Sequence, residues 1–342
     1  GYVRAGYALP IVGKALLATA SAPAMVLVGR LTDRFGKGLR SSPRDALITD
    51  MVDPSVRGRA FGFHRMLDTA GALAGVLIAA ALMWWLVPAA NHGSDGRDHP
   101  GALSESANAF RIIFAVASAL GLASLALVWL VRDPKSGARD SRHAPEASGR
   151  RTRFGVTPDC WRVIALVLIF TLANSTDTFL LLRAGELGHS PFSVVMVYAV
   201  FNVTYAAVSY PAGIWSDRLG RWKVIGMGWL IYAAVYAGFA ITNAAWVWPL
   251  MALYGVFMAF TDGVSKALIT DHAPSERRGT ALGIFYCLTG LATLLSSYLT
   301  GLIWDRVGAS AALWLGAGIA AFAVVLIPVL RPGPRPTGKS AA

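Results

Sequence analysis

The sequence predicts an all-α protein that crosses a membrane many times. The chain has 342 residues, of which 55% are hydrophobic and 15% are charged, whereas soluble domains carry about 25% charged residues. About ten stretches are long enough to cross hydrocarbon roughly 30 Å thick, which needs about 20 residues of helix. Basic residues gather in alternate loops between these stretches, which is the positive-inside bias of membrane proteins.

Each predicted span is an apolar run rich in Ala, Leu, Val and Gly. A transmembrane barrel would instead show alternating segments of about 10 residues, which the sequence lacks. One stretch, 24–50, is long enough to span but carries many charges. The predicted spans cover residues 6–22, 24–50, 62–86, 110–131, 162–183, 193–214, 224–242, 248–261, 281–303 and 310–330.

Basic residues also predict the orientation. The segment 132–161 is rich in Arg, and the other basic clusters fall on the same side when the spans are counted. The opposite loops contain few basic residues, Arg97 and Arg306 among them. We therefore expect a bacterial inner-membrane protein whose segment 132–161 and C-terminal tail are cytoplasmic. The Gly, Ser, Pro, Arg and Asp content of that segment is typical of a solvated linker.

Composition excludes several classes of protein. The net charge is +12, but no basic segment alternates with stacking aromatics, so nucleic-acid binding is not expected. Two cysteines, Cys160 and Cys287, are too few for a disulfide scaffold. A phosphate-binding loop for ATP is absent, and no metal or other cofactor is expected. The expected partners are a small-molecule substrate, protons and the lipid bilayer, and we expect a monomer.

An internal repeat is the most informative feature. Residues 46–50 read ALITD, and the same five letters recur at 267–271, an offset of 221. Arg57-Gly58 recurs as Arg278-Gly279 at the same offset. Both copies lead from a span into a loop on the cytoplasmic side, so the repeat is parallel rather than inverted. Parallel halves of several helices each are one of the known transporter architectures.

The repeat also predicts the organisation of the chain. The second half, 162–342, contains six spans and a cytoplasmic tail, whereas 1–131 contains four spans before the linker 132–161. The offset places the partner of the first second-half span before residue 1. We therefore expect about 10 of 12 transmembrane helices here, with the first two absent and the opening at Gly1 a cut end.

A loop in the second half carries a recognisable motif. Residues 213–223 read GIWSDRLGRWK. This loop resembles the G-x-x-x-D-R-x-G-R signature of the major facilitator superfamily. The resemblance implies two parallel six-helix halves and a gating role for this loop. The residues of the gating loop are Gly213, Asp217, Arg218, Gly220 and Arg221.

An alternative register exists. Residues 29–37 read GRLTDRFGK and also fit the signature. In that register 41–59 would have to begin the next span, although it is far too polar. The repeat instead pairs 24–50 with a membrane helix of the second half.

Ionisable residues inside spans are costly and therefore mark candidate functional sites. In 24–50, five basic residues fall within an arc of about 120° on a helix. This basic stripe either binds an anionic group of the substrate or locks conformational states through ion pairs. Its members are Arg30, Arg34, Lys37, Arg40 and Arg44.

Neighbouring spans supply acidic residues. Asp68 follows Arg65, Asp262 stands four residues before Lys266, and Asp177 has no basic residue within one turn. Asp262 and Lys266 can simply form a structural helical pair. The functional interpretation is that these carboxylates take part in proton coupling during transport or line the substrate cavity. The basic residues expected to share that role are Arg65, Lys266, Lys37, Arg40 and Arg44.

Together these features predict a secondary transporter that works by alternating access, with proton-coupled efflux of a small solute as the leading hypothesis. Proton-coupled uptake or uniport of a small organic anion is the alternative. A membrane enzyme acting on a lipid phosphate is the rival class, but the sequence lacks a clustered catalytic set such as HExxH.

Overall fold

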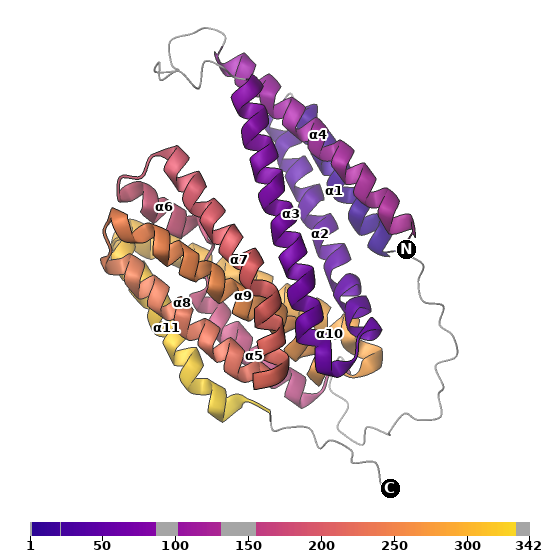
Figure 1. The fold of residues 1–342 in the computed structure, drawn as a ribbon, viewed down its shortest axis with the longest axis vertical. Helices are drawn as coiled ribbons and strands as arrows, with labels where there is room; N and C mark the ends of the chain where they lie inside the picture. Colours follow the sequence, from indigo (N-terminus) through magenta and orange to yellow (C-terminus); the bar gives the residue numbers. More distant parts are fainter. Residues whose placement is uncertain (1, 21, 87–101, 131–154, 333–342) are drawn as a thin grey trace. The chain divides into compact units, whose positions relative to one another are not determined.

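The computed structural model describes residues 2–20, 22–86, 102–130 and 155–332 (Figure 1). These residues form helices joined by short turns, and the described ranges contain no strand. Most of the predicted linker 132–161 lies outside the described residues. The α-helices are α1 (Tyr2–Ala18), α2 (Pro23–Met51), α3 (Arg57–Leu86), α4 (Ala102–Leu130), α5 (Pro158–Ala173), α6 (Thr178–Glu186), α7 (Pro191–Leu219), α8 (Arg221–Ile241), α9 (Val247–His272), α10 (Arg278–Arg306) and α11 (Ala309–Leu330).

Each predicted span corresponds to a helix, with α5 and α6 together covering 162–183. Within the described ranges, six segments are both long and apolar enough to cross a membrane, and all six lie between Pro158 and Leu330. Shorter apolar stretches lie in α1 and α4. Helix α2 is continuous from Pro23 to Met51. The alternative register, in which 29–37 forms a turn between spans, is therefore wrong.

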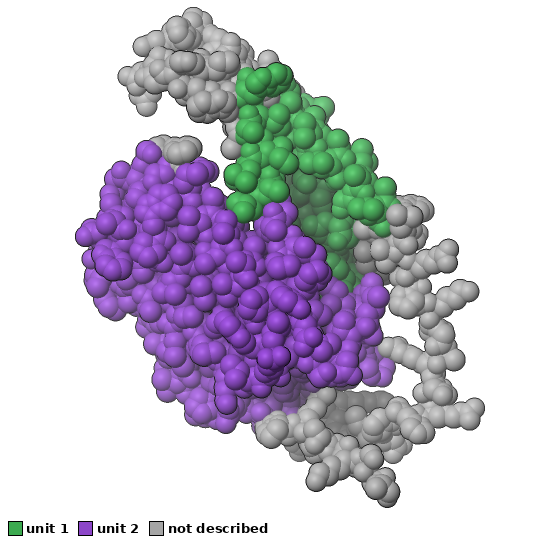
Figure 2. All heavy atoms as spheres, in the orientation of Figure 1, with its two compact units in different colours: residues 1–45, 72–149 green, residues 46–71, 150–342 purple. Residues whose placement is uncertain are grey.

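The chain divides into two compact units (Figure 2). Unit 1 contains residues 1–45 and 72–149, and unit 2 contains residues 46–71 and 150–342. The divisions fall inside α2 and α3, so the C-terminal end of α2 and the N-terminal end of α3 belong to unit 2. Unit 2 therefore contains both copies of the ALITD repeat.

Unit 1 is held together by close helix packing. Helix α1 packs along α4 (Figure 1). Gly29 and Gly36, seven residues apart on α2, let α1 approach closely. A Cβ added at Gly13 of α1 would lie 2.6 Å from the Gly29 carbonyl oxygen, and one at Gly36 would lie 2.5 Å from the Pro10 ring. Small residues at such contacts are typical of membrane helices.

Unit 2 is built around an aromatic core. Helix α7 packs against α9, and α8 packs against both α9 and α11 (Figure 1). Phe170 of α5 stacks on Trp229 of α8 with ring centroids 4.6 Å apart, and Tyr232 stacks on Tyr236 at 4.0 Å. Trp229, Tyr232 and Tyr236 are fully buried. This core fixes the positions of α5, α8 and α9, which carry most of the polar residues described next.

Candidate functional site

The first membrane span of unit 2 is broken. The predicted helix 162–183 ends at Ala173 as α5 and resumes at Thr178 as α6, with Asn174–Asp177 between them. The break frees backbone groups that must find partners inside the protein. Tyr232 donates a hydrogen bond to the Ala173 carbonyl at 2.6 Å. Broken helices of this kind surround the binding sites of many transporters.

Two serines of α10 complete the pairing of the break. The Ser296 hydroxyl donates to the Leu172 carbonyl at 2.9 Å, and the Thr176 N–H donates to Ser297 Oγ at 3.1 Å. The sequence signal for the break is the run Asn174-Ser-Thr-Asp-Thr178, because these residues favour helix caps over helix interiors. Because the residues on both sides are apolar, a prediction based on span length treats the whole stretch as one helix.

Asp177 lies at this break, as the N-cap of α6. Tyr254 of α9 donates a hydrogen bond to its Oδ1 at 2.6 Å. Across the described residues, no Lys, Arg or His side chain forms an ion pair with Asp177. This carboxylate therefore faces a phenol rather than a cation.

Asp262 of α9 has a very different environment. It forms ion pairs with Arg65 of α3 and with Lys266, whose Nζ lies 3.4 Å away. Tyr205 of α7 donates to its Oδ2 at 2.9 Å, and Arg65 also contacts Asp68 at 2.8 Å. The structure thus brings together four predicted residues, Arg65, Asp68, Asp262 and Lys266, in one ion-pair network.

A pocket of about 250 Å³ opens beside this network within unit 2. Asp262 lines it, together with Asn174 at the break. The remaining lining residues combine rings with hydroxyls, from α5, α8, α9 and α10. They are Val167, Phe170, Thr171, Trp229, Phe257, Met258, Thr261, Ser265, Phe285, Tyr286, Thr289 and Thr293. The sequence alone did not identify the hydroxyl residues, because single Thr and Ser residues in apolar helices carry no distinctive pattern.

The predicted gating loop forms the turn between α7 and α8. Gly220 has φ of +95°, a conformation that favours glycine, and it lets α8 begin at Arg221. The Asp217 carboxylate accepts hydrogen bonds from the backbone N–H of Gly58 at 2.9 Å and of Arg59 at 2.8 Å. It therefore caps the N-terminus of α3, where a negative charge is favourable.

Close packing of α3 on α7 makes this cap possible. A Cβ at Gly213 would overlap the Gly58 carbonyl oxygen, and a Cβ at Gly62 would overlap the Ser209 carbonyl oxygen. Arg221 Nη1 lies 2.9 Å from Asp217 Oδ1, whereas Arg218 is exposed. The glycines of the motif and of the repeat thus meet at one helix contact.

Ion pairs link the two copies of the repeat reciprocally. Arg57 of the first copy contacts Asp271 of the second at 2.9 Å, and Arg278 of the second contacts Asp50 of the first at 2.5 Å. Both pairs obey the offset of 221, and Arg221 also pairs with Asp271. The sequence shows these residues as a repeat but not as partners. The shared offset could have suggested the exchange.

The basic stripe lies on α2 in unit 1. The Arg40 guanidinium lies 4.4 Å from the Tyr7 ring centroid, and Arg44 Nε lies 2.8 Å from Asp45 Oδ1. Lys37 is exposed. A smaller pocket of about 160 Å³ is lined by Arg30 and Arg34 of the stripe, and by Lys14, Leu17, Asp33 and Phe114.

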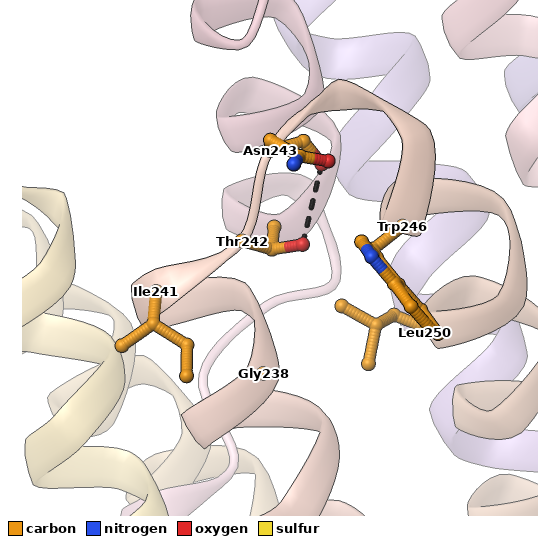
Figure 3. Close-up of a pocket in the computed structure, with 6 residues that line it drawn as sticks. All are labelled: Gly238, Ile241, Thr242, Asn243, Trp246 and Leu250. Atoms are coloured by element: carbon orange, nitrogen blue, oxygen red, sulfur yellow. Dashed lines mark hydrogen bonds between the residues drawn. The ribbon is translucent and has the colours of Figure 1, made fainter.

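A further pocket of about 310 Å³ lies at the turn between α8 and α9 (Figure 3). Gly238, Ile241, Thr242, Asn243, Trp246 and Leu250 line it. None of these six residues is charged, and none belongs to the predicted site. We therefore place the candidate site at the broken helix and the Asp262 network.

Comparison with known proteins identifies the family. The Major Facilitator Superfamily profile matches residues 3–197 and 163–342. This chain belongs to that superfamily. An MFS-type transporter of Methanocaldococcus jannaschii is 30% identical over 314 residues, covering 89% of this chain and 71% of the relative. The multidrug resistance protein MdtH of Cronobacter sakazakii is 26% identical over 285 residues, covering 81% of this chain and 63% of MdtH.

Solved structures agree on the fold. The E. coli fucose:proton symporter FucP superposes with a TM-score of 0.74 at 17% identity, covering 97% of this chain and 83% of FucP. The predicted all-helical fold is therefore confirmed. As a superfamily member, the chain is a multi-pass membrane protein and a secondary transporter, and it is not an enzyme.

Proposed function

We propose that this transporter exports a small solute in exchange for protons, and that Asp177 carries the proton. Two halves, 1–131 and 162–342, would rock about a central site while the linker 132–161 joins them. The observation that carries the proposal is the contrast between two membrane carboxylates. Asp177 accepts a hydrogen bond from Tyr254, whereas Asp262 is paired with two cations.

The contrast matters because a proton carrier must exist in two charge states. Arg65 and Lys266 offset the negative charge of Asp262, so the role we assign to that carboxylate is to hold α3 to α9 through ion pairs. Asp177 has no ion-pair partner in the described part of the chain, and an unpaired charge is costly in low dielectric. Binding a proton removes that cost, and loss of the proton restores it.

The turn between α7 and α8 would act as the gate. The Asp217 cap and the reciprocal pairs Arg57–Asp271 and Arg278–Asp50 lie at the ends of helices predicted to be cytoplasmic. They hold the second half against α2 and α3 within unit 2. Opening the cytoplasmic side would have to break these contacts, so they would stabilise the state that is closed to the cytoplasm.

Everted membrane vesicles carrying the protein and a pH-sensitive dye test the proposal. A panel of neutral drugs, organic cations and small organic anions is added after a pH gradient has formed. We expect at least one compound to dissipate the gradient with the wild type. With the variant Asp177→Asn no compound should dissipate the gradient, because an amide side chain does not take up a proton near neutral pH.

A matched control is Asp159→Asn, which neutralises an exposed carboxylate paired with Arg162 in the first turn of α5. This variant should exchange protons like the wild type. If Asp177→Asn still dissipates the gradient, Asp177 is not the proton carrier. If no compound dissipates it with the wild type, proton-coupled export is wrong.

One observation favours a second function, uptake or uniport of a small organic anion. The unit 1 pocket of about 160 Å³ is lined by Lys14, Arg30 and Arg34 against a single acid, Asp33. An excess of basic groups suits a carboxylate or phosphate. Uptake of labelled organic anions into whole cells, lost in Arg30→Gln with Arg34→Gln, would support this function instead.

A further inference from the structure

Several hydroxyl groups and one amide line the pocket beside Asp262. Thr171 lies on α5 and Asn174 is the C-cap of that helix, while α9 and α10 contribute Thr261 and Thr289. Hydroxyl groups normally serve as donor or acceptor, so the direction of their existing bonds decides what they can offer a ligand.

The hydroxyl protons of three threonines are already committed to the backbone. Thr171 donates to the Val167 carbonyl at 2.8 Å, Thr261 to the Phe257 carbonyl at 2.9 Å, and Thr289 to the Phe285 carbonyl at 2.8 Å. Each is a bond to the carbonyl four residues earlier in the same helix. Toward the pocket these oxygens therefore have lone pairs to offer, but not protons.

Asn174 adds an acceptor with no partner. Its Oδ1 is buried and accepts no hydrogen bond from the described residues. Buried polar atoms are normally satisfied, and an exception at the wall of a pocket indicates a group that pairs with a ligand. The break between α5 and α6 is what places this amide at the pocket.

The charges beside the pocket balance. Arg65 and Lys266 supply two positive charges, and Asp68 and Asp262 supply two negative charges in the same network. A carboxylate ligand would lie beside Asp262, which lines the pocket, and for an ammonium ligand the charge of Asp262 is already offset by Arg65 and Lys266. Neither sign of charge is favoured, so an uncharged ligand fits best.

We propose that this pocket binds an uncharged, hydrogen-bond-donating end of the solute, such as a primary amide or a hydroxyl, with an adjoining apolar body against the rings. Trp229, Phe257 and Phe285 supply these rings. The proposal rests on the proposed function in one respect, because it takes this pocket as part of the solute's path.

Three matched probes test the proposal by equilibrium binding to the purified protein without a pH gradient. Benzamide carries an N–H donor, N,N-dimethylbenzamide lacks one, and benzoate is an anion. Quenching of tryptophan fluorescence reports binding, because Trp229 lines the pocket. We expect benzamide to bind at least about tenfold more tightly than either of the others, as the loss of a hydrogen bond in a buried site predicts.

Variants locate the binding. Asn174→Leu removes the acceptor that has no partner. Thr289→Val removes a hydroxyl oxygen whose proton is donated to the backbone, on a different helix. Each variant should bind benzamide several-fold more weakly. Thr204→Val is the matched control, because Thr204 also donates to the carbonyl four residues earlier, at 2.6 Å, but does not line the pocket. It should bind benzamide like the wild type.

Equal binding of the three probes, no binding of benzamide, or unchanged binding in both pocket variants would overturn the proposal. Failure of proton exchange is a separate result. Asp177 does not line this pocket, so Asp177→Asn should still distinguish benzamide from N,N-dimethylbenzamide. Selective binding without proton exchange would leave the pocket assignment in place and refute only the proposed function.

Discussion

The two membrane carboxylates of unit 2 each accept a hydrogen bond from a tyrosine, but only one of them is paired with cations. Asp262 lies within a continuous helix and is surrounded by Arg65, Lys266 and the Tyr205 hydroxyl. Asp177 lies where a helix is broken and accepts a hydrogen bond from Tyr254. The difference teaches that two acids in apolar segments of one unit can have opposite electrostatic surroundings, and it is the basis on which we propose Asp177 as the proton carrier.

The largest expected effect is a difference in stability between variants of the two carboxylates. Asp262→Asn leaves the buried Lys266 without its carboxylate and should destabilise the protein by about 3 kcal/mol, as loss of one partner of a buried ion pair does. Asp177→Asn should cost less than about 1 kcal/mol, because no cation is left behind. Thermal unfolding of the purified variants measures both.

Removing the cation as well provides the control. Lys266→Met in the Asp262→Asn background should recover part of the lost stability, because it removes a buried cation that no longer faces the Asp262 carboxylate. If Asp177→Asn proves as destabilising as Asp262→Asn, the two carboxylates play the same structural role and the contrast between them is wrong.

An intermediate effect comes from the two tyrosines that donate to these carboxylates. Tyr254→Phe removes a neutral donor from Asp177 and should cost about 1.5 kcal/mol when that group is ionised. Tyr205→Phe should cost about 0.5 kcal/mol, because two cations still hold Asp262. Stability and proton exchange of the two variants can be compared directly, and both retain their rings.

Only Tyr254→Phe should also change the pH dependence of proton exchange. The Tyr254 hydroxyl contacts Asp177 directly, so its loss changes the surroundings of the proposed proton carrier itself. The profile of transport against pH should then differ from that of the wild type. An equal shift in Tyr205→Phe would contradict the assignment of Asp177 as the proton carrier.

The smallest effect concerns the reciprocal pairs. Asp50 is 43% exposed in its pair with Arg278, so Asp50→Asn should cost less than about 1 kcal/mol and less still at high salt. Asp271→Asn should cost more, because Asp271 pairs with both Arg57 and Arg221. Unfolding at low and high salt distinguishes the two. Equal losses would mean that the second arginine contributes nothing.

Much of the fold could be predicted because its causes are local. Long apolar runs predicted the helices from α1 to α11, and the ALITD repeat predicted parallel halves. The break at 174–177 was missed, although its cap residues are visible in the sequence. The length and hydropathy of the run predicted one continuous helix instead. A break inside a span is tolerated only when distant residues pair with the freed backbone groups, as Tyr232 and Ser296 do, and the sequence does not show those contacts.

The candidate site could be predicted only in part. The sequence by itself determined that Asp177 and Asp262 are acids within apolar helices, because burial in a membrane depends on the composition of the surrounding run. Only the tertiary structure decided that Arg65, far along the chain, neutralises one of them, and that Tyr254 holds the other. Hydrogen bonds and close ion pairs form only between groups a few ångströms apart, so an acid's role depends on neighbours that sequence spacing does not reveal.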